Sequence, residues 1–131
     1  LALWGLAFKA NTDDIREAPA LDIIAELTAA GMQVRAFDPV AGDNGRLHVA
    51  GNGQVVVVEE QYEALDGAAA LAVVTDWNQF RNPDFGRIRK KLSAPIIFDG
   101  RNLYSATLLA SHGFAYFAIG RPEINLREAQ S

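Results

Sequence analysis

The chain has 131 residues, half of them apolar, and its 12 basic and 16 acidic side chains give a net charge of −4. The apolar fraction is too high for a disordered chain, and the absence of cysteine excludes a disulfide scaffold, a thiolate nucleophile and a cysteine-ligated metal site. No apolar run approaches the roughly 18 residues of a membrane span, and no basic cluster supports nucleic-acid binding. One domain with a single core fits this length.

The first residues form an apolar run from Leu1 to Ala7, which predicts a buried strand. Nothing here resembles the charged start and the small-residue cleavage site of a signal peptide. Because a natural chain seldom begins inside a strand, we expect these residues to be a fragment of a longer, cytoplasmic protein.

Strand and helix patterns alternate along the rest of the chain. Pro19 opens a helix with apolar residues at helical spacing, and Gly31 is placed to end it. We expect further strands at 32–37, 55–58, 70–75, 95–98 and 114–119, and helices at 61–65, just after 77, at 85–92 and at 106–111. Residues 41–53 are rich in glycine and asparagine and are predicted to form a surface loop, and the residues after 121 a polar tail.

This alternation predicts an α/β fold with a doubly wound, mostly parallel sheet and helices on both faces, Rossmann-like but without a GxGxxG turn. The short, unbroken apolar strands agree, since parallel strands are buried on both sides. Ligands of such sheets bind at the carboxyl ends of the strands. The residues that follow each strand are therefore the candidates for function.

The first connection, residues 8–18, is longer than most strand-to-helix connections, and long ones are often functional. It offers two cations, Lys9 and Arg16, which suit a phosphate or a carboxylate. It lacks the glycine-rich turn that brings the backbone close to a dinucleotide pyrophosphate. The alternative is that these two cations only organise the loop, by pairing with nearby carboxylates: Asp13, Asp14 or Glu17.

A second candidate turn follows the strand at 95–98. Gly100 permits a sharp turn that would place Arg101 over the sheet edge. The alternative is a guanidinium that pairs with Asp99 on the surface.

The other strand ends have weaker signals. Thr75 or Asp76 is expected to cap the next helix, with Trp77 packed over it. His48 and His112 have no metal-ligand partner at useful spacing, and neither is assigned a role.

Four segments in register resemble the C-terminal domain of the UDP-glucose/GDP-mannose dehydrogenase family. They are residues 5–19 (GLAFKANTDDIREAP), 37–39 (FDP), 74–80 (VTDWNQF) and 99–104 (DGRNLY). The ending, with GFAY at 113–116 and IGR at 119–121, is similar to the UDP-glucose branch of that family. The resemblance covers nearly the whole chain.

In that family an N-terminal Rossmann domain holds NAD, a central helical region carries the catalytic cysteine, and the C-terminal domain closes over the sugar nucleotide. The resemblance implies that residues 1–131 are the UDP-sugar-binding domain of an enzyme that oxidises UDP-glucose to UDP-glucuronate with two NAD. It implies that Phe8, Lys9 and Arg101 contact the nucleotide sugar, and that Arg16 reaches NAD on the other domain. No catalytic residue and no metal are assigned to this chain.

The same resemblance places the catalytic cysteine and the NAD domain upstream of Leu1, so we expect the fragment alone to be inactive. Its expected partners are the nucleotide sugar and the enzyme's own N-terminal and central domains, in a homo-oligomer, with neither nucleic acid nor membrane. Ala10 stands where the family often has proline, and Ser105-Ala106 where it often has Asp-Pro, although Ser105 can still cap the next helix. Two alternatives stay open: a dehydrogenase for UDP-N-acetylmannosamine or GDP-mannose, and a stand-alone flavodoxin-like binding module.

Overall fold

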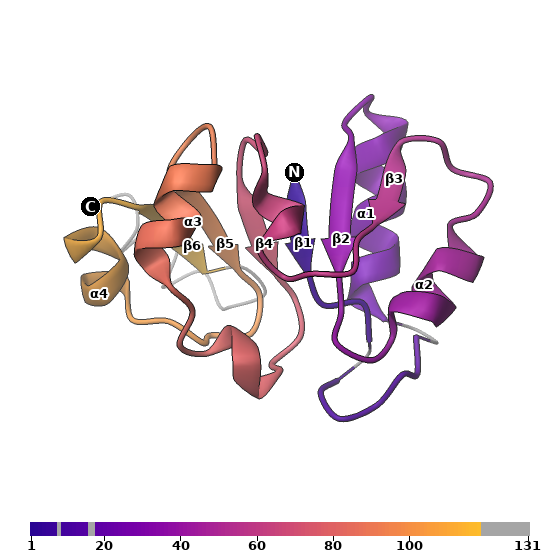
Figure 1. The fold of residues 1–131 in the computed structure, drawn as a ribbon, viewed down its shortest axis with the longest axis horizontal. Coiled ribbons are helices and arrows are strands. Elements are labelled where there is room, and N and C mark those ends of the chain that lie inside the picture. Colours follow the sequence, from indigo (N-terminus) through magenta and orange to yellow (C-terminus); the bar gives the residue numbers. More distant parts are fainter. Residues whose placement is uncertain (8, 16–17, 119–131) are drawn as a thin grey trace.

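The computed structural model describes residues 1–7, 9–15 and 18–118, and these form one six-stranded sheet. Its order is β3-β2-β1-β4-β5-β6, and every neighbouring pair is parallel (Figure 1). The strands are β1 (Ala2–Trp4), β2 (Val34–Phe37), β3 (Val55–Val57), β4 (Leu71–Val73), β5 (Ile96–Asp99) and β6 (Ala115–Ala118). The predicted doubly wound parallel sheet is confirmed.

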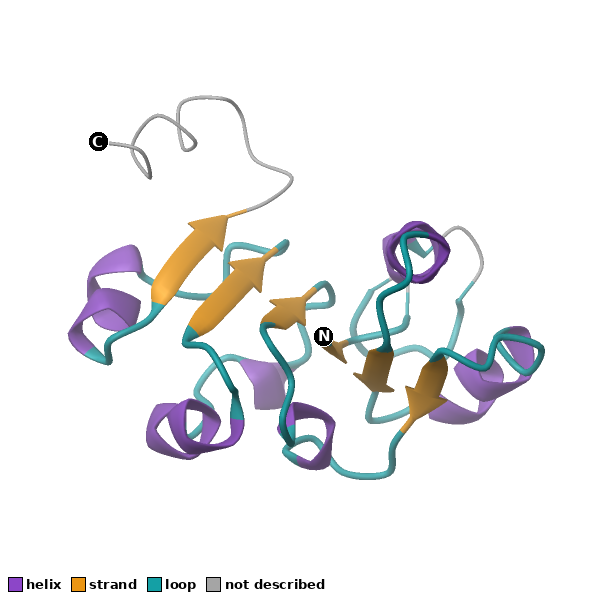
Figure 2. Ribbon diagram, turned by 90° about the horizontal axis from the view of Figure 1, so that it is seen from above, coloured by secondary structure: helices purple, strands orange, loops and turns teal. Residues whose placement is uncertain are grey.

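Helices lie on both faces of the sheet, as Figure 2 shows. They are α1 (Pro19–Ala29), α2 (Gly42–His48), α3 (Phe85–Lys91) and α4 (Ala106–Ser111), with the 3₁₀ helices η1 (Glu63–Leu65) and η2 (Asn78–Phe80). In the part of the chain that the structure describes, no helix is both long and apolar enough to cross a bilayer.

Successive strand residues point to opposite faces, and they fill two separate cores instead of the single core that the length predicted. Leu3 belongs to the core under α1, where it is buried together with Ile24. Trp4 belongs to the other core, with Phe80 of η2 and Ile88 of α3. The central strands β1 and β4 are therefore buried on both sides, which explains why they are apolar without alternation, whereas β6 at the edge of the sheet has no fully buried residue.

Local signals define both ends of α1. Pro19 is the first helical residue, and Ala18 before it is extended, with φ −69° and ψ 128°, as a residue preceding proline should be. At the other end Gly31 has φ +90°. The predicted start and stop of this helix are confirmed.

The prediction of a surface loop over 41–53 is wrong for residues 42–48, which form α2, whereas residues 49–53 belong to no helix or strand. The backbone N–H groups of Val40 and Ala41 donate to the carboxylate of Asp38, which leads the chain into this helix. Gly45 is buried, and a Cβ there would lie 2.6 Å from Cδ1 of Leu6. Glycine at position 45 therefore allows close packing against Leu6 and is not a sign of a flexible loop.

Other differences are small. The helix predicted at 61–65 is the single 3₁₀ turn η1, β2 begins at Val34 instead of residue 32, and β4 is shorter than predicted. Ser105 caps α4, because its side-chain oxygen accepts a hydrogen bond from the N–H of Leu108 at 3.2 Å. The polar tail predicted after residue 121 lies outside the described residues.

Candidate functional site

The direction of winding reverses between β1 and β4, the two central strands of the sheet. In doubly wound folds, ligands bind at the carboxyl ends of the strands beside this switch point. Lys9 follows β1 and Arg101 follows β5, so both predicted cations lie at the carboxyl edge, with β4 between their strands. In Figure 1 this is the lower edge, where the indigo loop of residues 9–15 lies.

A buried carboxylate, that of Asp38, organises the switch point from the end of β2. Its Oδ2 accepts hydrogen bonds from the N–H groups of Leu6 (2.8 Å) and Ala7 (3.1 Å) and from the indole Nε1–H of Trp77 (3.1 Å). Its Oδ1 accepts the N–H groups of Val40 and Ala41 at 2.9 and 2.7 Å. The backbone donors after β1, which in a dinucleotide site would face a phosphate, are thus used by the protein's own anion.

The side chain of Thr75 occupies the space beside the turn directly after β1. Gly5 has φ +107°, and a Cβ there would lie 2.4 Å from Oγ1 of Thr75. That hydroxyl donates to the carbonyl of Ala7 at 2.9 Å. The backbone of residues 5–7 therefore does not fit the pyrophosphate of a dinucleotide, which needs the backbone to be open at this turn. The prediction that Thr75 or Asp76 caps the next helix is wrong, because η2 has no side-chain cap.

A second buried carboxylate, that of Asp99, closes the turn after β5. Its Oδ1 accepts the N–H of Arg101 at 3.0 Å. Its Oδ2 accepts the N–H groups of Leu103 and Tyr104 at 2.7 and 2.9 Å and the hydroxyl of Tyr116 at 2.7 Å. Hydrogen bonds to a charged carboxylate are stronger than those between neutral groups, so Asp99 holds the backbone of this turn in place.

The side chain of Arg101 pairs with Asp76, not with Asp99. Its Nη2 lies 3.6 Å from Oδ2 of Asp76, and Nη2 of Arg81 lies 4.0 Å from the same oxygen. The alternative of an Arg101–Asp99 side-chain pair is wrong, because Asp99 is buried and bonded to backbone N–H groups. All three side chains are between 32% and 48% exposed, and pairs this exposed contribute only about 0–1 kcal/mol. Two guanidinium groups therefore share one carboxylate.

Each candidate loop contains an asparagine in the left-handed region, Asn11 with φ 67° and Asn102 with φ 58°. They are the two non-glycine residues with positive φ among those described, and asparagine tolerates this conformation better than most residues. The first loop is also held from α2, because Nδ2 of Asn44 donates to the carbonyl of Asp13 at 2.9 Å. Lys9 itself is exposed.

Two of the four predicted site residues, Phe8 and Arg16, lie outside the described residues. Sequence reasoning missed the roles of Asp38, Asp99 and Tyr116. An aspartate directly after a strand, followed by proline or glycine, is a recognisable signal for a side chain that bonds to its own turn, whereas nothing local marks Tyr116.

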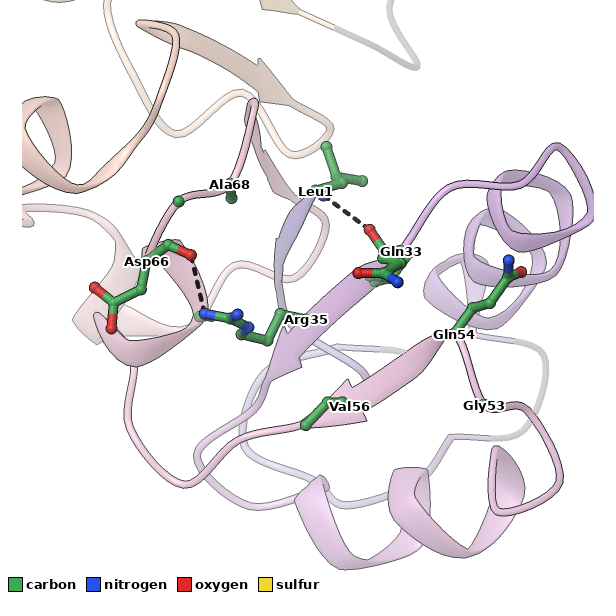
Figure 3. A pocket seen from close by; sticks show the side chains of 11 residues that line it. Leu1, Gln33, Arg35, Gly53, Gln54, Val56, Asp66 and Ala68 are labelled. Atoms are coloured by element: carbon green, nitrogen blue, oxygen red, sulfur yellow. Dashed lines mark hydrogen bonds between the residues drawn. The ribbon is translucent and has the colours of Figure 1, made fainter.

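A pocket of about 300 Å³ lies at the opposite, amino edge of the sheet (Figure 3). There Nη1 of Arg35 donates to the carbonyls of Glu63 and Asp66 at 3.3 and 3.0 Å. This guanidinium is thus bound to the first residue of η1 and to the residue that follows its last. Across the described ranges, no group of three or more His, Cys, Asp and Glu is arranged to hold a metal ion.

The fold and the site define a class: a doubly wound α/β domain that presents cationic side chains, not a glycine-rich turn, at its carboxyl edge. A family model described as the UDP-glucose/GDP-mannose dehydrogenase family, UDP binding domain, matches residues 2–106. The chain belongs to this family.

Individual relatives agree with the family match. The UDP-glucose 6-dehydrogenase of Pseudomonas aeruginosa is 48% identical over 125 residues, which are 93% of this chain and 28% of that protein. The UDP-glucose 6-dehydrogenase of Rhizobium meliloti is 40% identical over 123 residues, 94% of this chain and 28% of that protein. The chain therefore spans about a quarter of the length of these relatives.

Solved structures show the same fold. The UDP-D-ManNAc dehydrogenase of Pyrococcus horikoshii superposes with a TM-score of 0.71 at 29% identity, over 92% of this chain and 25% of that one. The UDP-glucose dehydrogenase of Pyrobaculum islandicum superposes with a TM-score of 0.67 at 29% identity, over 81% of this chain and 22% of that one.

Proposed function

We propose that residues 1–131 act as the C-terminal UDP-sugar-binding domain of an NAD-dependent UDP-glucose 6-dehydrogenase, which oxidises UDP-glucose to UDP-glucuronate. The observation that carries this proposal is the turn after β5, where the buried Asp99 holds the backbone of Arg101 and leaves its guanidinium partly exposed at the carboxyl edge. The 48% identity to the Pseudomonas aeruginosa enzyme supports UDP-glucose as the substrate.

The proposed ligand contacts are Phe8, Lys9 and Arg101. A pyrophosphate carries the charge that the two cations complement, with Lys9 as a point charge and Arg101 as a two-pronged donor. The backbone donors at the ends of β1 and β5 are already bonded to Asp38 and Asp99. This favours side chains as the source of the positive charge that binds the nucleotide.

The chemistry of oxidation is assigned to residues outside this chain. The sequence contains no cysteine, so no thiolate is present to form a covalent intermediate with the substrate. This domain would bind and orient the nucleotide sugar, and the other domains of the same enzyme, in a homo-oligomer, would complete the site.

NAD supplies hydride-accepting chemistry when it is bound to the enzyme. Because the turn at residues 5–7 does not fit a dinucleotide, we place NAD on an N-terminal domain and assign only Arg16 to its contact from this side.

Another nucleotide sugar is the second candidate, since the structures with this fold include a UDP-D-ManNAc dehydrogenase. The identity to that protein is 29%, against 48% and 40% to two UDP-glucose 6-dehydrogenases. UDP-glucose is therefore the preferred substrate, and a stand-alone flavodoxin-like module is not favoured.

Titration calorimetry of the 131-residue chain with UDP tests the proposal. Arg101→Ala and Lys9→Ala should each weaken binding about tenfold, the effect of losing one charge-assisted hydrogen bond of roughly 1.4 kcal/mol. Lys90→Ala removes an equal charge from the last turn of α3, before the amino end of β5, and should leave the affinity unchanged. If both site variants bind UDP as the wild type does, the nucleotide site lies elsewhere.

The same sample incubated with UDP-glucose and NAD should produce NADH only at background, followed by absorbance at 340 nm. Turnover proportional to the concentration of this chain would overturn the assignment of the chemistry to other domains.

A further inference from the structure

The turn that carries Arg101 is held by side chains from two further elements. Tyr116 of β6 is half-buried and places its hydroxyl 2.7 Å from Oδ2 of Asp99. The same hydroxyl lies 3.1 Å from the carbonyl of Tyr104. The edge strand β6 therefore contacts both the first and the last residue of the turn at 99–104.

A second contact holds the turn at 99–104 against η2, close to the residues that pair with Asp76. The hydroxyl of Tyr104 donates to the carbonyl of Phe80 in η2, next to Arg81. Arg81 and Arg101 share Asp76. The position of the turn at 99–104 relative to Asp76 is thus fixed by the phenol of Tyr104 as well as by Asp99.

From this geometry we infer that Tyr116, acting through Asp99, is a positioning residue for Arg101 in nucleotide binding. The inference deepens the proposed function and rests on it. Asp99 uses Oδ1 for the N–H of Arg101 and Oδ2 for Leu103, Tyr104 and Tyr116. A rotation of this carboxylate that weakened one set of bonds would disturb the other, because both oxygens belong to one rigid plane.

The hydroxyl of Tyr116 restrains that rotation from the side of β6. Its removal leaves the three backbone N–H groups on Asp99 but takes away the donor that belongs to a neighbouring strand. The turn also contains Asn102 in the left-handed region, a conformation that persists where surrounding contacts over-determine it. Loss of the Tyr116 restraint should therefore broaden the positions of the Arg101 guanidinium.

A double-mutant cycle in the 131-residue chain, with UDP as the probe, tests this inference. Tyr116→Phe should weaken UDP binding about threefold to tenfold in the wild-type background. In the Arg101→Ala background it should change the affinity by less than twofold, because the group that it positions is gone. Asp99→Asn, the second variant, should weaken binding more than Tyr116→Phe and should likewise lose its effect in the Arg101→Ala background.

Asp84→Ala is the matched control for lost stability. It removes the side-chain oxygen that caps α3 by accepting the N–H of Arg87 at 3.0 Å, and it takes no hydrogen-bond partner from Asp99 or Arg101. It should lower the unfolding temperature without changing the affinity for UDP. Amide hydrogen exchange gives a readout without ligand: in Tyr116→Phe the amides of Arg101, Leu103 and Tyr104 should exchange faster than in the control.

The outcomes distinguish a failure of the proposed nucleotide site from a failure of the role given to Tyr116. If Arg101→Ala binds UDP as the wild type does, the proposed site and the inference both fail. If Arg101→Ala weakens binding while Tyr116→Phe does not, or if Tyr116→Phe costs the same factor in both backgrounds, only the inference fails and Tyr116 is a structural residue.

Discussion

The indole Nε1–H of Trp77 donates to Oδ2 of Asp38 across 3.1 Å, between two buried side chains 39 positions apart in the sequence. Asp38 follows β2 and Trp77 follows β4, the two strands on either side of β1. The same oxygen accepts the N–H groups of Leu6 and Ala7 after β1. One carboxylate therefore joins three adjacent strand ends at the switch point.

Asp38→Asn should destabilise the fold by about 2–4 kcal/mol, measured by urea unfolding. The amide keeps one acceptor but turns an NH₂ group toward donors that the carboxylate had satisfied, and each unsatisfied buried donor costs about 1–3 kcal/mol. Asp13→Asn makes the same chemical change at an exposed position and should lie within about 0.5 kcal/mol of the wild type. Equal stability of the two variants would contradict the role given to Asp38.

Gly5→Ala should be more damaging than Gly31→Ala. Both glycines have positive φ, +107° and +90°, so alanine is strained at both. At Gly31 no atom lies within 4 Å of the added Cβ, whereas at Gly5 it would meet Oγ1 of Thr75 at 2.4 Å and the backbone nitrogen of Thr75 at 2.9 Å. We expect a loss of about 1 kcal/mol at Gly31 and at least about 3 kcal/mol at Gly5, and thermal unfolding compares them. Similar losses would show that Thr75 yields to the new side chain.

We expect the free energy of unfolding to fall at alkaline pH because of the phenol of Tyr104. Burial raises the pKa of Tyr104 above its usual value, and the neighbouring Asp99 raises this pKa further. The unfolded chain therefore ionises this tyrosine above about pH 10 while the folded chain does not, so the unfolding free energy falls as pH rises, by up to about 1.4 kcal/mol per pH unit.

Tyr104→Phe removes that titration. Its unfolding free energy should fall less steeply between about pH 10 and 11 than that of the wild type, in urea titrations at each pH. At neutral pH the variant is less stable, because the phenol no longer donates to the carbonyl of Phe80. Identical slopes in the two proteins would mean that Tyr104 ionises freely in the folded state.

Arg16→Ala separates a cofactor contact from a substrate contact. In the 131-residue chain we expect unchanged affinity for UDP. In a complete enzyme that contains this domain, we expect a Michaelis constant for NAD raised about tenfold, for the loss of one charge-assisted contact of about 1.4 kcal/mol. If the Arg16→Ala enzyme has the same Michaelis constant for NAD as the wild-type enzyme, Arg16 does not belong to the site.

Local patterns in the sequence determined the architecture of this protein. Apolar runs separated by helical periodicity predicted the parallel sheet, and Pro19 and Gly31 predicted the ends of α1, because these signals act within a few residues. The rule that parallel strands end at one edge then placed Lys9 and Arg101 together on that edge without any knowledge of side-chain contacts.

Only the tertiary structure decided how that edge is organised. Residues 42–48 are glycine-rich and poor helix formers, yet they form α2 where Gly45 packs against Leu6. The side chain of Arg101 pairs with Asp76 and not with Asp99 two residues before it, since Asp99 is buried by the backbone of its own turn and by Tyr116 from the next strand. The formation of α2 and the pairing of Arg101 depend on residues that are distant in the sequence and become neighbours only after the sheet is assembled. No local periodicity or propensity therefore encodes them.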